Sequence, residues 1–102
     1  MTLQQLEYFL AAYRHGSFSG AAEELHLAQP SLSEQVRRLE AELGVQLFAR
    51  VGRGLAATEA GETLRPHAER TLAAAEAARE SVVDVLALRY GADSRRDDGP
   101  NL

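Results

Sequence analysis

The segment that most constrains the fold of this chain is residues 18–37, FSGAAEELHLAQPSLSEQVR, because it predicts two short helices joined by a tight turn. Ala21 and Ala22, with Leu25 one turn later, suit close packing against a neighbouring helix. Pro30 fits the first turn of the second helix, where its missing N–H costs nothing because that donor has no intrahelical partner. This arrangement is typical of a helix-turn-helix, whose second helix enters a DNA major groove.

The second helix of this motif has one apolar and one polar face when residues are placed at about 100° per position. The apolar arc predicts a buried stripe of Leu32, Val36, Leu39 and Leu43. The opposite arc, with Ser33 on its flank, contains Pro30, Glu34, Arg37, Arg38 and Ala41. Such a face can put side chains on base edges and arginines on phosphates. An ordinary amphipathic helix with a solvated Arg/Glu face explains this segment, taken alone, equally well.

Length and composition indicate one small, cytoplasmic domain. A chain of 102 residues buries only about 60–65% of its unfolded surface, so dimerisation would help to stabilise it. Cysteine is absent, which excludes disulfides and thiolate zinc sites and fits a reducing compartment. The first residues, MTLQQLEYFL, contain no basic leader, and no apolar run approaches the roughly 20 residues that span a bilayer. We therefore expect a soluble protein without a membrane partner.

The net charge of −4 does not by itself favour a nucleic-acid partner. Its distribution is more informative, because four arginines fall between residues 37 and 53, on the second helix and just beyond it. Affinity for DNA depends on local phosphate contacts rather than on total charge. Acidic residues elsewhere on the surface are therefore compatible with DNA binding.

The motif is preceded by a helix and followed by a hairpin. An opening helix over residues 3–14 carries Leu3, Leu6, Phe9, Leu10 and Tyr13 on one face and stops at His15-Gly16. Ser17 or Ser19 would cap the next helix, and Gly44 would end the groove helix in the left-handed conformation. The stretch LFARVGRGLAAT then predicts a β-hairpin with Arg53 at its tip, a wing. The alternative is an irregular loop, because Leu55-Ala56-Ala57 makes a poor strand.

Residues 58–88 predict a long helix that begins at the N-cap Thr58 and is bent by Pro66. At about 1.5 Å per residue it forms a rod of ~45 Å, too long to fold back onto fewer than 60 residues. Its apolar stripe is therefore expected to pair with a second copy of the chain. The dimerisation residues are Leu64, Ala68, Leu72, Ala75, Val82 and Leu86. The polar tail, residues 89–102, is expected to be a loose end or linker.

These segments together resemble the N-terminal domain of the LysR-type transcriptional regulators. The resemblance covers residues 2–88 and rests on GSFSGAAEELHLAQPSLSEQVRRLE, LGVQLFAR and TEAGE in the right order and at the right distances. It implies a mainly α fold: a winged helix-turn-helix of three helices plus a hairpin over residues 1–57, then a linker helix over residues 58–88. In this family the linker helix pairs antiparallel with its partner in a dimer.

The resemblance also implies where DNA would be contacted. The groove-helix contacts fall on Gln29, Pro30, Ser31, Ser33, Glu34 and Arg37, the wing contact on Arg53, and backbone contacts near Arg50. Ser19 and Arg38 complete the predicted DNA-binding set. Two positions depart from the family pattern: Ala28 stands where Ser or Thr is usual, and Glu34 where many members carry arginine. The effector-binding domain is not found after residue 88, so we expect either an excised fragment or a short member.

The chemistry of the remaining residues argues against an enzyme. His15, His26 and His67 are scattered with no carboxylate at metal-ligand spacing, no serine lies in a nucleophile elbow, and Gly52-Arg53-Gly54 lacks the context of a phosphate-binding loop. We expect no metal, no cofactor and no small-molecule site.

Three functions fit the sequence. The leading one is sequence-specific binding to an interrupted inverted repeat in double-stranded DNA, as a homodimer or higher oligomer that regulates transcription. The alternatives are a dimerisation module that pairs with and modulates a full-length regulator, and a sequence-tolerant architectural DNA binder.

Overall fold

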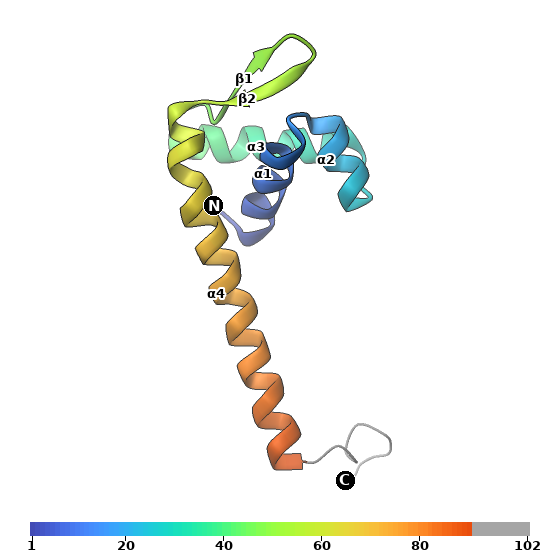
Figure 1. Cartoon of the computed structure of the whole chain (residues 1–102), viewed down its shortest axis with the longest axis vertical. Helices are drawn as coiled ribbons and strands as arrows, with labels where there is room; N and C mark the ends of the chain where they lie inside the picture. The colour runs from blue at the N-terminus through green and yellow to red at the C-terminus, as the bar shows by residue number, and fades with distance from the viewer. Residues whose placement is uncertain (91–102) are drawn as a thin grey trace. The chain divides into compact units, whose positions relative to one another are not determined.

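Four helices and one β-hairpin follow one another in the computed structural model, which describes residues 1–90 (Figure 1). They are α1 (Leu3–His15), α2 (Phe18–Leu25), α3 (Gln29–Leu43), β1 (Phe48–Val51), β2 (Gly54–Ala57) and α4 (Glu59–Tyr90). This order confirms the predicted winged helix-turn-helix followed by a long helix.

Side-chain caps fix the starts of the first two helices. Thr2 and Gln5 form a reciprocal capping box at the start of α1, which satisfies two backbone N–H groups that lack intrahelical acceptors. At the start of α2 the hydroxyl of Ser17 accepts a hydrogen bond from the N–H of Gly20 at 2.9 Å. Of the two caps predicted for α2, Ser17 is therefore the one used, whereas Ser19 lies exposed within the first turn.

The turn between α2 and α3 presents its histidine to solvent. His26 adopts the left-handed conformation with φ of 57° and ends α2. Leu25 and Leu27 on either side are half-buried against the core. At the far end of α3, Gly44 takes the predicted left-handed conformation with φ of 73°.

The core is formed by α1, α2, α3 and the start of the hairpin. Its buried apolar side chains include Leu6, Phe9, Leu10, Ala21, Ala22, Leu32, Val36, Leu39, Leu47 and Phe48. The ring of Phe48 lies 5.3 Å from that of Phe9 and meets the ring of Phe18 edge-on at 6.1 Å. Such pairs contribute about 0.5–1.5 kcal/mol beyond the area that they bury. The base of the hairpin is thereby joined to α1 and α2.

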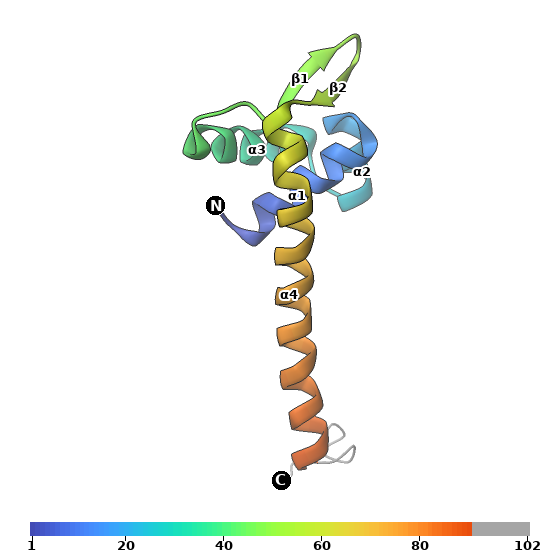
Figure 2. The same ribbon diagram turned by 60° about the vertical axis from the view of Figure 1, so that its left-hand side comes forward.

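The hairpin is an antiparallel pair in register from Phe48↔Ala57 to Val51↔Gly54, with Gly52 at a positive φ of 58° in its loop. Both Figure 1 and Figure 2 show this loop projecting away from α1, α2 and α3. The N–H of Leu55 donates to the carbonyl of Gly16 at 2.8 Å. The predicted wing is confirmed, and this bond to the end of α1 compensates for the weak strand propensity of its second strand.

The first turns of α4 pack against the core, so one prediction is wrong. Ala68 is fully buried in the core cluster, and Leu64 and Leu72 are half-buried against it. From the length of the helix we predicted that its apolar stripe, including Leu64, Ala68 and Leu72, has no partner within the chain. The partner exists because α4 begins at the base of the hairpin (Figure 2), and Leu64, Ala68 and Leu72 in its first turns pack against the core cluster. Ala68 is thus a core residue and is not available to a second copy.

Polar contacts accompany this packing. The hydroxyl of Tyr13 on α1 donates to Glu62 at 2.7 Å, and the guanidinium carbon of Arg65 lies 5.7 Å from the Tyr13 ring centroid. The hydrogen bond to Glu62 is the main cause that raises the pKa of Tyr13. The compact unit therefore spans Met1–Leu72 and extends past the boundary predicted at residue 57.

Residues 73–90 form a second unit and continue as helix. Large apolar side chains are exposed along it: Val82, Val83, Val85, Leu86 and Leu88. The pairing of Ala75, Val82 and Leu86 with a second copy stays a prediction. The helix covers the first residues of the predicted tail, and residues 91–102 lie outside the described part of the chain. None of the described helices is long and apolar enough to cross a membrane.

Candidate nucleic-acid interface

Helix α3 separates a buried apolar face from an exposed polar one. Leu32, Val36 and Leu39 are fully buried, as predicted from the helical period. The exposed face carries Pro30, Ser31, Glu34, Arg37, Arg38 and Ala41, and Gln29 at the start is half-buried. The N-cap residue Ala28 makes no side-chain cap, so the positive end of the helix dipole is not masked by a capping oxygen. A polar, cationic surface therefore lies along one side of α3.

Ser33 does not belong to this surface, contrary to the prediction. It is only 2% exposed, because it directly follows the buried Leu32 and lies one turn before the buried Val36. Its hydroxyl lies 3.3 Å from the carbonyl oxygen of Pro30, to which it donates, and 3.4 Å from an Nη of Arg37, from which it accepts. Ser33 therefore contacts Arg37 and is not part of the exposed face.

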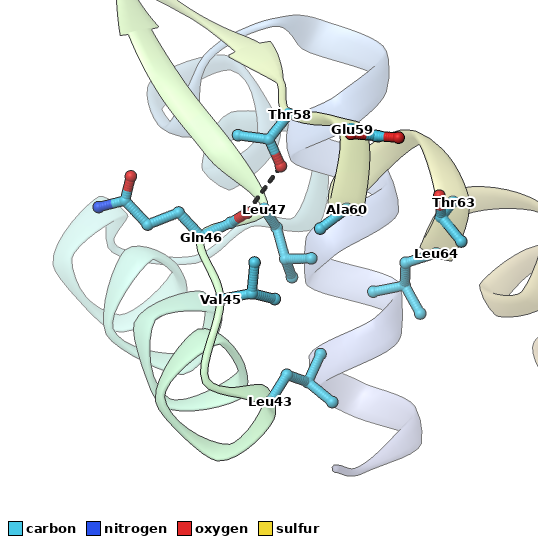
Figure 3. Close-up of a pocket in the computed structure, with 9 residues that line it drawn as sticks. All are labelled: Leu43, Val45, Gln46, Leu47, Thr58, Glu59, Ala60, Thr63 and Leu64. Carbon is cyan, nitrogen blue, oxygen red and sulfur yellow. Dashed lines mark hydrogen bonds between the residues drawn. The ribbon is translucent and has the colours of Figure 1, made fainter.

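Leu43 was predicted to extend the buried stripe and is instead 41% exposed. The core ends one turn earlier, at Leu39. Leu43 and Val45 line a hollow together with Ala60 and Leu64 of α4, as Figure 3 shows. The C-terminal end of α3 therefore presents an apolar surface next to the first turns of α4.

Two arginines and one glutamate of α3 form a compact group. Glu34 accepts a hydrogen bond from Nε of Arg38 at 3.2 Å, and its other carboxylate oxygen lies 3.7 Å from Nε of Arg37. All three side chains are at least half exposed. An exposed ion pair is worth about 0–1 kcal/mol, so a phosphate can displace the carboxylate at small cost. The structure thus brings together three of the predicted DNA-binding residues.

The other predicted arginines lie on the wing. Arg50 is exposed on β1, and Arg53 is exposed in the loop between Gly52 and Gly54. Neither guanidinium forms an ion pair with a carboxylate of residues 1–90, unlike Arg37 and Arg38. The wing therefore carries two positive charges with no intramolecular competitor in the described chain.

Three residues that the sequence did not reveal orient the wing. The carboxylate of Glu40 accepts from the N–H groups of Leu47 at 2.7 Å and Phe48 at 3.3 Å. The hydroxyl of Thr58 donates to the carbonyl of Gln46 at 2.6 Å, as drawn in Figure 3, and accepts from the N–H of Gly61. The sequence predicted Thr58 only as a helix cap. These bonds fix the base of the hairpin to the end of α3 and the start of α4.

Gly61 is the third such residue. A Cβ at this position would lie 2.3 Å from the carbonyl oxygen of Leu47, which also accepts the N–H of Thr58 at 2.9 Å. Only glycine permits this approach of α4 to the wing. Its position inside an otherwise alanine-rich helix was the available sequence signal.

A separate ionic group joins α1 to α2. Glu24 lies 2.6 Å from Nε2 of His15 and 2.7 Å from an Nη of Arg14. The hydrogen bond from His15, followed by the charge of Arg14, lowers the pKa of Glu24. These contacts hold the two helices that support α3 and explain His15 without a ligand role.

A helix-turn-helix with an exposed polar second helix and an arginine-tipped hairpin defines a winged DNA-binding domain. Residues 3–62 match the family model described as "Bacterial regulatory helix-turn-helix protein, lysR family". The chain belongs to the LysR family of bacterial regulatory proteins, and the described fold is the DNA-binding domain of that family.

Several curated relatives are transcriptional regulators. The regulator CfxR of Cupriavidus necator is 45% identical over 91 residues, which are 89% of this chain and 29% of CfxR. The regulator BudR of Klebsiella aerogenes is 46% identical over 80 residues, 78% of this chain and 56% of BudR. The chain thus spans less than a third of CfxR and just over half of BudR. Their names point away from an enzyme.

Solved structures share the fold. The CbnR DNA-binding domain in complex with DNA has a TM-score of 0.79 and 36% identity, covering 83% of this chain and 98% of that one. The DNA-binding domain of BenM, also crystallised with DNA, has a TM-score of 0.80 and 35% identity, covering 83% of this chain and 96% of that one. Each match covers almost the whole of the solved DNA-binding domain.

Proposed function

We propose that this chain binds double-stranded DNA sequence-specifically, with α3 in the major groove, and thereby regulates transcription. The observation that carries the proposal is the exposed polar face of α3 opposite a fully buried apolar one. An α-helix of this kind fits the width of a major groove. The similar CbnR and BenM domains, both crystallised with DNA, support DNA binding by this fold.

The chemistry of five residues of α3 allows each of them a role at the DNA. Gln29, Ser31 and Glu34 lie in the first two turns of α3, where a groove helix contacts base edges. Glu34 can accept a hydrogen bond from cytosine N4. Arg37 and Arg38 follow one turn later and can hold phosphates.

The remaining contacts come from the wing and from α2. Arg53, flanked by glycines at the loop, has the freedom to enter a narrow minor groove. Arg50 on β1 and the exposed Ser19 at the start of α2 are assigned to the phosphate backbone. Ser33 is left out of the proposed interface because it is buried.

We further propose that two copies bind together through residues 73–90. Exposed Val82 and Leu86 lie one turn apart on this helix, and a helix that exposes such a stripe is stabilised by a partner. Two-fold symmetry then requires an interrupted inverted repeat with half-sites about 34 Å, or a multiple of that distance, apart. Linking two half-site contacts in this way raises affinity by about 10²–10⁴-fold.

A binding titration tests this proposal. The full chain is used to select a duplex from a random-sequence library, and its affinity for the selected duplex and for a scrambled one is measured at two salt concentrations. Preference for the selected duplex by ~10³-fold or more is expected for a specific regulator. Equal affinities for both duplexes would indicate an architectural binder, and no binding to either would leave only the dimerisation module.

A further inference from the structure

We propose that Glu34 is a specificity-determining residue that acts by holding Arg37 and Arg38 until a matching base edge replaces them. The inference rests on the proposed DNA binding and deepens it. A DNA contact of Glu34 alone would explain preference for one base. Its pairing with both arginines of the α3 surface assigns it a second effect, on binding to DNA of any sequence.

The geometry of the group carries the inference. One carboxylate oxygen of Glu34 faces Nε of Arg38 at 3.2 Å and the other faces Nε of Arg37 at 3.7 Å. Spacings of three and four residues put both arginines one turn beyond the glutamate, and a glutamate N-terminal to its cation is the favourable order on a helix. Neither arginine is paired with another carboxylate among residues 1–90. One acidic side chain therefore neutralises part of the charge of both.

The wing provides the contrast. Arg50 and Arg53 are exposed and have no carboxylate partner in the described residues, so they are available to any phosphate at once. Arg37 and Arg38 become fully available to phosphates only when their ion pairs with Glu34 break. Binding to DNA of any sequence depends almost entirely on phosphate contacts. While Glu34 holds them, Arg37 and Arg38 therefore contribute less to such binding than the unpaired wing cations do.

A DNA site with a cytosine opposite Glu34 allows both arginines to leave the glutamate. When a cytosine N4 amino group donates to Glu34, the carboxylate keeps a hydrogen bond while the arginines turn to the phosphates. At a site without such a donor, the carboxylate either keeps the arginines from the phosphates or, once it releases them, lies in the groove without a hydrogen-bond partner. Glu34 thus weakens binding to wrong sequences more than to the right one, and the ratio of the two affinities rises.

The decisive variant is Glu34→Gln, which removes the charge and preserves the side-chain length. Affinity for a scrambled duplex is expected to rise by about threefold per protomer, the size of one exposed ion pair. The dependence of affinity on salt should steepen by up to ~0.9 for each additional phosphate that a released arginine neutralises. Affinity for the duplex selected by the parent chain should not rise as much, so the ratio of specific to scrambled affinity falls.

The matched control is Glu7→Gln, which makes the same change of charge on α1. Glu7 is exposed and forms no ion pair within residues 1–90. A second control repeats Glu34→Gln in an Arg38→Ala background, where the rise in affinity for scrambled DNA should shrink because the two residues act on each other. Circular dichroism of each variant checks that the helices are retained.

The outcomes separate the inference from the function on which it rests. If the parent chain binds neither duplex, the proposed DNA binding itself fails. If the parent prefers the selected duplex and Glu34→Gln behaves like Glu7→Gln on scrambled DNA, the masking of the arginines is refuted and the DNA-binding function stands. A loss of affinity for scrambled DNA in Glu34→Gln would also refute the masking of the arginines, since the glutamate would then assist binding.

Discussion

Replacing Gly61 by alanine tests whether the contact between α4 and the wing outweighs helix propensity. Propensity alone favours the change, because alanine is about 1 kcal/mol better than glycine inside a helix. The structure predicts the opposite sign. The new Cβ would lie 2.3 Å from the carbonyl oxygen of Leu47, whereas ordinary contact begins at 3.4 Å. The start of α4 and the base of the wing must therefore separate by about 1 Å.

This separation affects more than the new methyl group. Overpacking of this kind costs about 1–3 kcal/mol. The same Leu47 carbonyl accepts the N–H of Thr58 at 2.9 Å, and weakening that bond costs about 1 kcal/mol more. After the gain of about 1 kcal/mol in helix propensity is subtracted from these two costs, we expect the free energy of unfolding to fall by ~2 kcal/mol. For a domain of this size the loss lowers the melting temperature by about 10 °C.

Thermal and urea unfolding followed by circular dichroism measures this effect. The matched control is Ala74→Gly, at an exposed position of the same helix, which reports the propensity effect without the close approach. Gly61→Ala should destabilise the chain even though the control shows that glycine is the poorer helix former. A rise in the melting temperature of Gly61→Ala would refute the reasoning, because it would mean that α4 does not approach Leu47 as described.

Three further predictions concern dimerisation, phosphate contact and pH. Leu86→Glu should sediment as a monomer with weakened DNA binding and an unchanged melting temperature of the winged domain, whereas Leu72→Glu, half-buried against the core, should lower that temperature. Arg50→Ala should reduce the salt dependence of DNA affinity by ~1.8 for a dimer, since one phosphate contact is removed per protomer, and a slope equal to that of the parent would show that Arg50 touches no phosphate. Because the pKa of Glu24 is lowered below its ordinary value of 4.5, mainly by His15, this group contributes stability above pH 4.5 that is lost as the pH falls through its folded pKa. Glu24→Gln should flatten the pH dependence of unfolding in that acidic range, and an unaltered profile would mean that the group does not stabilise the fold.

Periodicity predicted the buried face of α3 from the sequence, and it failed where the neighbours of the helix decide burial. Leu32, Val36 and Leu39 are covered because other elements lie over them, whereas Leu43 is one turn past the end of the core. Ser33 has a polar side chain on the flank of the polar arc, yet its neighbours bury it. The position of a residue around a helix does not tell how far the neighbouring elements extend along that helix.

The same limit applies to α4 and to the wing. The stripe of α4 was recognised, but periodicity cannot say whether the helix's own domain or a second copy covers Ala68. Glu40 contacts the N–H groups of Leu47 and Phe48 across a turn, and no local pattern marks such a contact. The candidate site was predictable where it follows from the face of one helix or the tip of one loop. It was not predictable where elements meet.

The bonds at the base of the hairpin have a kinetic consequence. A two-stranded hairpin with four residues per strand is at best marginally stable in water. In this chain the N–H groups of Leu47, Phe48, Leu55 and Thr58 donate across the base to Glu40, Gly16 and Leu47 of the folded domain. We therefore expect these amides to exchange with solvent more slowly than those of an isolated hairpin. The wing backbone that carries Arg50 and Arg53 is consequently ordered before any DNA arrives, and only their exposed side chains lose conformational entropy on encounter.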